Sequence, residues 1–307
     1  MEFDPEKWAK SQPESQVWPN APLARHCSFR IGGPAKLLAE AVGEAGLKAL
    51  WRLSRRLSWP IFVLGAGTNV LFDDKGYDGL VLRLGQGHSE TKINDGRLMA
   101  GAGATIAQLV KLARDLGLSG LEPLAGLPGT LGGALKGNAG GALGSIGGLV
   151  EKIRILGPSG EIRDIGPAGF NFGYRRLTPG PGLKGGIILG AELALVQATP
   201  AEVDKKTKEA LALRAGQPKG RTAGCVFKNP LVPPPGGEEI LSAGQLIDMC
   251  GFKGRRLGGA MVSEAHANFI VNVKKAKSAD VLGLIEAIKL AVFERFGLAL
   301  ELEIVQP

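Results

Sequence analysis

One cysteine, with a lysine and an asparagine close behind it, is the first group in this chain that could do chemistry. Residues 223–230 read AGCVFKNP, which places Cys225 beside a glycine and a few residues before Lys228 and Asn229. A thiol in such a setting is a nucleophile, a proton donor or a buried small apolar residue. No histidine stands at the spacing of a known thiol hydrolase, so the pattern leaves these three interpretations open.

A glycine turn follows the apolar residues 61–64. Its sequence, GAGTN, can present backbone N–H groups and polar side chains to a phosphate. A dinucleotide fingerprint needs a third glycine at position 70, where the chain has Val70, and the GK[ST] of a P-loop is absent. This turn alone supports a phosphate site and a plain hairpin-like turn equally. The residues that it offers to a ligand are Gly65, Ala66, Gly67, Thr68 and Asn69.

A second, longer glycine-rich segment covers residues 117–148, with 12 glycines and few charges. It is too long for an ordinary connection and too apolar for a solvated linker, and long structured loops of this kind are usually functional. Because it has few bulky side chains, its backbone can lie against a flat or extended ligand. We therefore favour a binding role. The residues expected to contact the ligand are Gly126, Pro128, Gly129, Thr130, Gly132, Asn138 and Gly140.

Composition narrows the class of protein. The 307 residues carry 37 Lys and Arg against 29 Asp and Glu, a net charge of +8, which suits anionic substrates or nucleic acid. Aromatic residues make up only 6% and the basic residues are scattered, which argues against nucleic acid. The three cysteines form no CxxC pair, so we expect a reducing compartment and no structural metal. The first residues, MEFDPEKW, are unlike a signal peptide, and no apolar stretch is long enough to cross a membrane. We expect a cytoplasmic protein.

The elements that must position these groups are helices and strands in mixed order, which predicts an α/β or α+β fold. Apolar residues at helical spacing predict helices over 43–57 and 105–116. A polar helix is expected over 200–214, a short one over 242–250 and a long one, capped by Ser278, over 278–296. Short apolar or alternating runs predict strands over 61–64, 79–84, 150–156, 185–196, 269–273 and 300–304.

Seven segments, taken in order, resemble one family, the UDP-N-acetylenolpyruvoylglucosamine reductases, which are flavoenzymes that make UDP-N-acetylmuramate for peptidoglycan. These segments are PLARHCSFRIGGPA, VLGAGTNVLF, GLEPLAGLPGTLGGALKGNAG, NFGYRRL, AGCVFKNP, AGQLIDMCGFKGRRLGGAMVSEAHANFIVN and LELEI, and they extend over most of the chain. The resemblance implies an α+β fold: a two-subdomain FAD-binding module of the vanillyl-alcohol-oxidase type, over 1–78 and 79–199, and a C-terminal α/β substrate-binding domain over 200–307. It also implies non-covalent FAD, NADPH as co-substrate and a UDP-sugar substrate.

The same resemblance assigns three catalytic positions. The family's arginine falls on Arg175, its proton donor on Cys225 where most members keep a serine, and its glutamate on Glu303. Two further departures are Ala142, where a tyrosine is common, and Leu177, where a serine is. Residues implied to bind the substrate are Tyr174, Arg175, Lys228 and Asn229.

Chemistry supports these roles independently. Hydride delivered through FAD N5 to the β-carbon of an enolpyruvyl ether moves charge onto the α-carbon and its carboxylate, which an arginine fork can bind. An ordinary thiol, with a pKa of about 8.5, is mostly protonated at neutral pH and can then supply a proton. Glu303 is an acid or an orienter of water; without the resemblance it reads as an exposed strand glutamate, as Glu301 does.

Two rival functions stay open at this stage. The first is another FAD-dependent oxidase or dehydrogenase of the same superfamily, although AGCVFKNP and the LELEI segment argue against it. The second, suggested by charge alone, is a non-catalytic nucleotide-binding or nucleic-acid-binding protein. We expect small-molecule partners only, no membrane insertion and a monomer.

Overall fold

The computed structural model describes residues 4–11 and 14–307, which divide into two compact units. Unit 1 groups Met1–Pro19, Leu37–Ala66 and Asp78–Ala215. Unit 2 groups Asn20–Lys36, Gly67–Tyr77 and Gly216–Pro307. Because the units group segments by their internal contacts, the domain limits expected at residues 78 and 199 stay a prediction.

The helices agree well with the sequence pattern. They are α1 (Pro5–Lys10), α2 (Glu44–Leu57), α3 (Ile106–Asp115), α4 (Leu131–Lys136), α5 (Pro200–Ala212), α6 (Ala243–Met249) and α7 (Ser278–Phe296). All five predicted helices are present; α1 and α4 were not foreseen. Helices α3, α5 and α6 begin with a capping box, in which a Thr or Ser and the Glu or Gln three residues later bond to each other's backbone N–H.

The strands form several small sheets. They are β1 (Ser15–Pro22), β2 (Pro34–Ala41), β3 (Ile61–Val63), β4 (Tyr77–Leu84), β5 (Thr91–Asn94), β6 (Arg97–Gly101), β7 (Leu118–Ser119), β8 (Gly140–Gly141), β9 (Gly144–Ser145), β10 (Val150–Leu156), β11 (Ile162–Ile165), β12 (Phe170–Gly173), β13 (Arg176–Pro179), β14 (Ile187–Ala194), β15 (Val196–Gln197), β16 (Arg256–Leu257), β17 (Ala260–Val262) and β18 (Ile270–Asn272).

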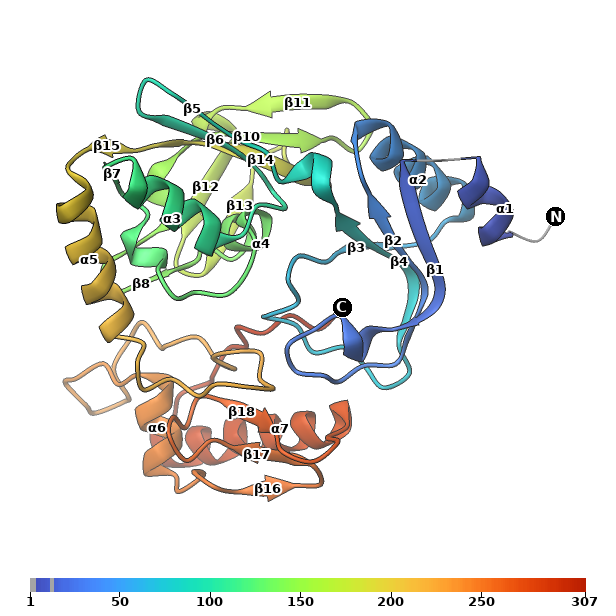
Figure 1. Cartoon of the computed structure of the whole chain (residues 1–307). Helices are drawn as coiled ribbons and strands as arrows, with labels where there is room; N and C mark the ends of the chain where they lie inside the picture. The colour runs from blue at the N-terminus through green and yellow to red at the C-terminus, as the bar shows by residue number, and fades with distance from the viewer. Residues whose placement is uncertain (1–3, 12–13) are drawn as a thin grey trace. The chain divides into compact units, whose positions relative to one another are not determined.

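Unit 1 is built around an antiparallel sheet in the order β11-β10-β14-β6-β5 and most of a four-stranded sheet in the order β1-β2-β4-β3 (Figure 1). Helix α2 places Leu47, Leu50 and Leu53 on one face, and all three are buried against the four-stranded sheet. The same core includes Leu189 of β14. Residues of both sheets therefore belong to one apolar core within unit 1, and the helical period of α2 places its three leucines on the face that packs against this core.

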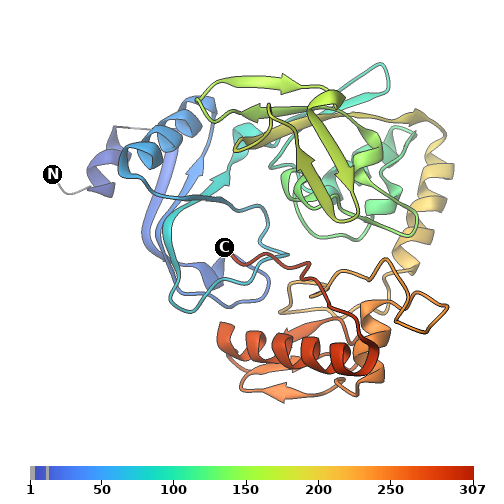
Figure 2. The same cartoon turned by 180° about the vertical axis from the view of Figure 1, so that it is seen from behind.

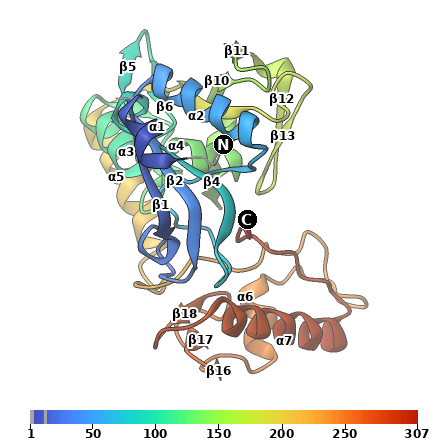
Figure 3. The same cartoon turned by 90° about the vertical axis from the view of Figure 1, so that its right-hand side faces the viewer.

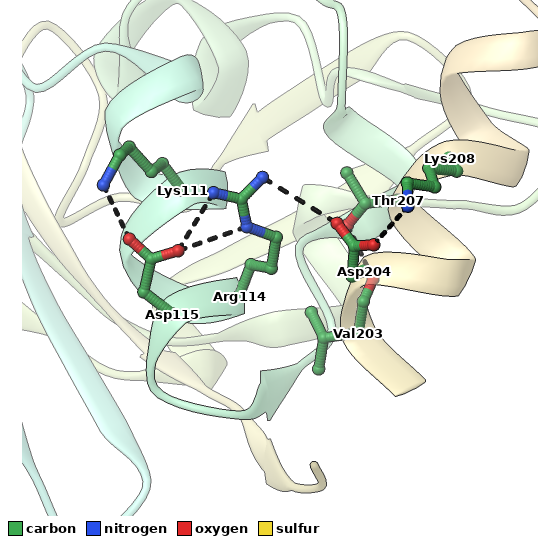
Figure 4. A network of polar contacts seen from close by, with 7 residues as sticks. All are labelled: Lys111, Arg114, Asp115, Val203, Asp204, Thr207 and Lys208. Atoms are coloured by element: carbon green, nitrogen blue, oxygen red, sulfur yellow. Dashed lines mark hydrogen bonds and ion pairs between the residues drawn. The ribbon is translucent and has the colours of Figure 1, made fainter. Parts of the chain in front are cut away.

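Helix α5 packs beside α3 through buried residues such as Val203 and Ala210, and charged side chains pair on the exposed faces of the two helices (Figure 4). Asp204 of α5 pairs with Lys208 at 2.7 Å and approaches Arg114 of α3 at 3.9 Å. Asp115 pairs with Arg114 at 3.0 Å. Exposed pairs of this kind contribute about 0–1 kcal/mol each, so they orient α5 more than they stabilise it. That orientation matters because the chain that leaves α5 carries Arg214.

Unit 2 holds a small antiparallel sheet, in the order β16-β17-β18, with α7 packed against it (Figures 2 and 3). Helix α7 begins at Ser278 as its first residue, and its N-cap is Lys277 rather than the predicted Ser278. The carboxylate of Asp74 accepts from the backbone N–H of Ser278 at 2.9 and 3.0 Å and from its hydroxyl at 2.9 Å. A side chain distant in sequence thus bonds the N-terminus that Ser278 was expected to cap.

The strand predicted over residues 300–304 is wrong. This segment makes only single bridge pairs, between Leu302 and Phe227 and between Val305 and Val70. The Leu-Glu alternation does place residues on opposite sides of an extended chain. Because the segments on its two sides are irregular, no continuous ladder forms.

Over residues 4–11 and 14–307, no helix has both the length and the hydropathy needed to span a bilayer. Within the same residues, no three His, Cys, Asp or Glu side chains gather as a metal site.

Candidate active site

The two glycine-rich segments of unit 1 meet at Gly65 and Thr130. A Cβ added to Gly65 would stand 2.5 Å from the hydroxyl oxygen of Thr130, so only glycine allows this approach. Thr130 pairs with Thr105 in a short bridge, in which Gly129 accepts from Ile106 at 3.0 Å. Gly65 and Thr130, one from each glycine-rich segment, are therefore neighbours within unit 1, and their contact with a cofactor stays a prediction.

Backbone conformation accounts for two other glycines of the long segment. Gly126 and Gly129 have φ values of +79° and +142°, which L side chains rarely adopt. Gly132 is glycine for a different reason, since a Cβ there would approach the Cβ of Ala102 at 3.0 Å. The segment is therefore a tightly turned loop that packs against residues 102–106.

Arg214, just after α5, is a residue that the sequence reading treated only as part of a polar helix. Its guanidinium donates to the carbonyls of Pro123 at 2.8 Å and Ala125 at 3.0 Å, which fastens the long glycine segment to the end of α5. Burial, and next the positive charge of Arg175, lower the pKa of Arg214. No sequence signal distinguished this arginine from its neighbours.

Arg175 occupies the turn of the hairpin β12–β13, in which Gly173 pairs with Arg176. Its φ is +51°, the left-handed region, and a non-glycine residue there costs about 1 kcal/mol. The guanidinium donates to the carbonyl of Gly140 at 2.9 Å. Tyr174, its partner in the turn, is 43% exposed. The predicted catalytic arginine is thus held in a strained turn, beside the predicted Gly140.

Asn138 is buried, and its amide is engaged on both sides. Nδ2 donates to the carbonyl of Gly173 at 2.8 Å, and Oδ1 accepts from the backbone N–H of Gly147 at 3.0 Å. The sequence analysis expected this side chain to contact the cofactor. In the structure its polar atoms bond to the Arg175 hairpin and to the glycine segment.

Cys225 and Glu303 lie in adjacent backbone segments of unit 2. Glu303 donates its backbone N–H to the carbonyl of Val226 at 2.8 Å, and on the other side Cys225 forms a bridge pair with Phe269. Gly224, before the cysteine, has φ +79° with open space around it. Two of the three predicted catalytic residues therefore come together through backbone pairing.

Three other predicted binding residues of unit 2 have structural partners. The Asn69 amide donates to the carbonyl of Glu303 at 3.0 Å. Lys228 pairs with the exposed Glu301 at 3.1 Å, and Asn229 accepts from the backbone N–H of Ala243 at 3.0 Å, where α6 begins. These bonds give Asn69 and Asn229 roles in fixing the backbone near Glu303 and α6.

Gly67 and His266 are explained by their local surroundings. Gly67 has φ +67°, and a Cβ there would strike the carbonyl of His26. His266 accepts from the backbone N–H of Asn268 at 3.2 Å, and burial lowers the pKa of its ring, with Lys253 adding to the effect. His266 thus makes a structural hydrogen bond within its own loop.

Comparisons with known proteins agree with this geometry. The FAD binding domain model matches residues 35–166, and the model of the UDP-N-acetylenolpyruvoylglucosamine reductase C-terminal domain matches residues 217–306. The reductase of Geobacter metallireducens is 39% identical over 297 residues, covering 96% of this chain and 95% of that protein. That of Heliobacterium modesticaldum is 40% identical over 287 residues, covering 92% and 88%.

Solved structures give the same result. The reductase of Thermus caldophilus is similar with a TM-score of 0.79 and 36% identity, covering 95% of this chain and 98% of that one. A berberine bridge enzyme variant, at 15% identity and a TM-score of 0.50, covers 64% of this chain and 44% of that chain and shares the fold alone. The fold is α+β, an FAD-binding module followed by a C-terminal domain, as the sequence predicted.

The residues present fit FAD. Among the described residues, the amide groups of Gly65, Ala66, Gly129 and Thr130 donate to no backbone carbonyl, and Gly65 and Thr130 are adjacent. Arg214 places a positive charge at the same glycine segment. Backbone amides that donate to no carbonyl are donors that the diphosphate of FAD can use. With the matched models and the relatives of nearly full length, this chain belongs to the UDP-N-acetylenolpyruvoylglucosamine reductase family, and it is an FAD-dependent oxidoreductase.

Proposed function

We propose that this chain reduces UDP-N-acetylglucosamine enolpyruvate to UDP-N-acetylmuramate with NADPH, and that Cys225 supplies the proton. The observation that carries the proposal is the backbone bond between Glu303 and Val226, because it sets the thiol segment beside the predicted glutamate. FAD, held by residues of the two glycine-rich segments, would supply the hydride chemistry that links NADPH to the β-carbon of the enolpyruvyl group. The remaining steps belong to the side chains of this chain.

Arg175 is the proposed ligand of the substrate carboxylate. As the β-carbon gains hydride, negative charge develops on the α-carbon and the carboxylate oxygens, and a planar guanidinium with two parallel N–H donors stabilises it. Arg175 exchanges its bond to the carbonyl of Gly140 for the substrate. Tyr174 is exposed beside it, which supports its proposed place among the substrate-binding residues.

Cys225 then transfers its proton to the α-carbon, and the resulting thiolate regains a proton from solvent. Glu303 is the proposed group that acts near the same carbon, as an acid or through a positioned water. Lys228 supplies positive charge for the diphosphate of the UDP-sugar, since its partner Glu301 is exposed and exchanges readily. We propose small-molecule partners, a monomeric and cytoplasmic enzyme, and flavin contacts from the residues of the two glycine clusters other than Asn138.

An anaerobic isotope experiment tests this function. The purified protein should be yellow, NADPH should bleach its flavin, and the enolpyruvyl substrate should restore the colour. With NADPH deuterated at its transferable position the label should appear on the β-carbon of the product, and in deuterated water it should appear on the α-carbon. The rival oxidase function would replace this proposal if the enolpyruvyl substrate left the flavin bleached, while oxygen reoxidised it and an alcohol substrate could reduce it again.

A further inference from the structure

We propose that Asn138 is a positioning residue for Arg175: its amide holds the β12–β13 turn against the glycine segment, so that the arginine faces the substrate carboxylate. This inference rests on the proposed function, because it concerns how the carboxylate ligand of that reaction is held. It assigns the buried amide to the hairpin, in place of the cofactor contact that the sequence suggested.

The backbone of Asn138 terminates helix α4. Asn138 donates its N–H to the carbonyl of Leu135 at 3.2 Å, and Ala139 donates to that of Ala134 at 2.8 Å. These two bonds form the paired pattern of a Schellman motif, in which the residue after the C-cap takes a left-handed conformation. Asn138 does so, with φ +41°. Glycine is the usual residue here, so the backbone alone does not call for an asparagine.

The side chain explains the asparagine. It is 8% exposed, and each half of the amide has one partner, Gly173 on the hairpin and Gly147 on the glycine segment. An amide can donate and accept at once, whereas aspartate can only accept at neutral pH. The Asn138 side chain therefore ties the residue before the Tyr174–Arg175 turn to a fixed loop.

Two other contacts link the hairpin to the same loop, while Leu177 and Phe170 pack on the core beside β10. Gly147 faces Phe172 so closely that an added Cβ would stand 2.5 Å from the ring. Arg175 bonds to the carbonyl of Gly140, two residues after Asn138. A two-residue turn with an arginine in the left-handed region is not stable by itself, since such turns favour glycine, asparagine or aspartate. The surroundings must hold it, and Asn138 is a buried polar side chain that bonds to its backbone, at the carbonyl of Gly173.

The decisive variant is Asn138→Gly, because glycine keeps the Schellman motif and removes only the amide. We expect normal flavin content and normal bleaching by NADPH. Reoxidation by the enolpyruvyl substrate should slow about tenfold, as expected for one lost hydrogen bond and a misplaced reacting group. Substrate affinity, read from the shift that the substrate causes in the flavin absorption spectrum, should fall as well. Asn138→Asp should be slowed at least as much, since its carboxylate would face the carbonyl of Gly173.

A matched control and a coupling measurement make the test specific. Asp95→Gly alters another left-handed residue (φ +47°), directly after strand β5, and should change none of these readings. If Asn138 acts through Arg175, adding Asn138→Gly to Arg175→Lys should slow reoxidation little beyond Arg175→Lys alone. Independent, multiplicative effects would overturn the inference.

The two proposals fail differently. If wild-type protein does not reduce the enolpyruvyl substrate, or Arg175→Lys reacts at the wild-type rate, the proposed function fails. If Arg175→Lys is slow and Asn138→Gly equals wild type, only the positioning role fails. Loss of flavin from Asn138→Gly would restore the cofactor contact expected from the sequence.

Discussion

The β12–β13 hairpin of unit 1 and the Cys225–Glu303 pair of unit 2 hold their functional residues by opposite means. Arg175 is carried by a strained turn that depends on side-chain bonds from Asn138 and to Gly140. Cys225 and Glu303 belong to extended segments joined by backbone bonds. Bonds between backbone atoms do not depend on which side chains the two segments carry, whereas a turn held by side chains does. This contrast allows a cysteine at position 225, where the resemblance leads one to expect a serine.

The largest effect is expected from removing the Cys225 thiol, which takes away the proposed proton donor but leaves the backbone bonds of its segment intact. Cys225→Ala should lower substrate-driven reoxidation about 10³-fold, within the usual range for loss of an acid catalyst, whereas Cys225→Ser should retain substantial turnover. Both should still be bleached by NADPH, and their thermal unfolding should match wild type. Cys250→Ala, a change at the half-exposed cysteine of the same unit, is the control. Wild-type turnover in Cys225→Ala would leave the thiol a packing residue.

The next effect addresses the turn. Arg175→Lys should slow reoxidation about 10²–10³-fold, because an ammonium lacks the two-donor fork. Arg175→Gly should lose at least as much activity and yet raise the free energy of unfolding by about 1 kcal/mol, since glycine accepts the positive φ without strain. Urea titration of both variants separates the two results. Equal stability of glycine, lysine and wild type would mean that the turn stores no strain.

A smaller effect is expected from Asn69→Ala. This variant removes the bond from the Asn69 amide to the carbonyl of Glu303, yet the backbone bonds from Val305 to Asn69 and from Glu303 to Val226 remain. Reoxidation should therefore slow less than about fivefold, clearly less than in Asn138→Gly. Stopped-flow rates for the two variants, measured side by side, give the comparison directly. A greater loss from Asn69→Ala would show that side chains, too, determine the geometry in unit 2.

The smallest effect is a pH dependence in unit 1. His88 is buried, and burial lowers the pKa of its ring although the carbonyl of Gly43 and the charge of Glu44 oppose the shift. The folded chain thus binds fewer protons here than the unfolded chain, so stability falls as the pH drops below about 6.5. The slope from one group stays under about 1.4 kcal/mol per pH unit. His88→Gln should flatten the loss of stability between pH 7 and 5.5 in urea titrations; an unchanged profile would assign that loss to other groups.

The sequence was sufficient where local physics decides the structure. The spacing of Leu47, Leu50 and Leu53 predicted α2, and Thr105 with Gln108 marks the start of α3. The tight turns of the glycine-rich segments could also be predicted, because φ values such as +142° at Gly129 require glycine. These features depend on residues near one another in the chain.

The rest of the site depends on partners distant in sequence. The residue types of Tyr174 and Arg175 do not predict a turn, because neither is a good turn former and their surroundings hold them in place. The partners of the Asn138 amide are 9 and 35 residues away, and the carbonyls of Ala125 and Pro123, which Arg214 contacts, are 89 and 91 residues away. The Leu-Glu alternation over residues 300–304 correctly predicted an extended chain. It wrongly predicted a strand, because a strand also needs a regular neighbour to pair with.

The backbone pairing of the segment around Leu302 also sets an order of events during synthesis. Unit 2 draws on residues 20–36, 67–77 and 216–307, and Val305 must pair with Val70 while Glu303 bonds to Val226. Every residue of unit 1 has been translated by position 215, so its core can assemble while the ribosome is still extending the chain. The early segments of unit 2 must wait for partners made some 230 residues later. In a nascent chain arrested near position 290, unit 1 should therefore be folded, whereas the segments that carry Cys225 and Glu303 should not yet be paired.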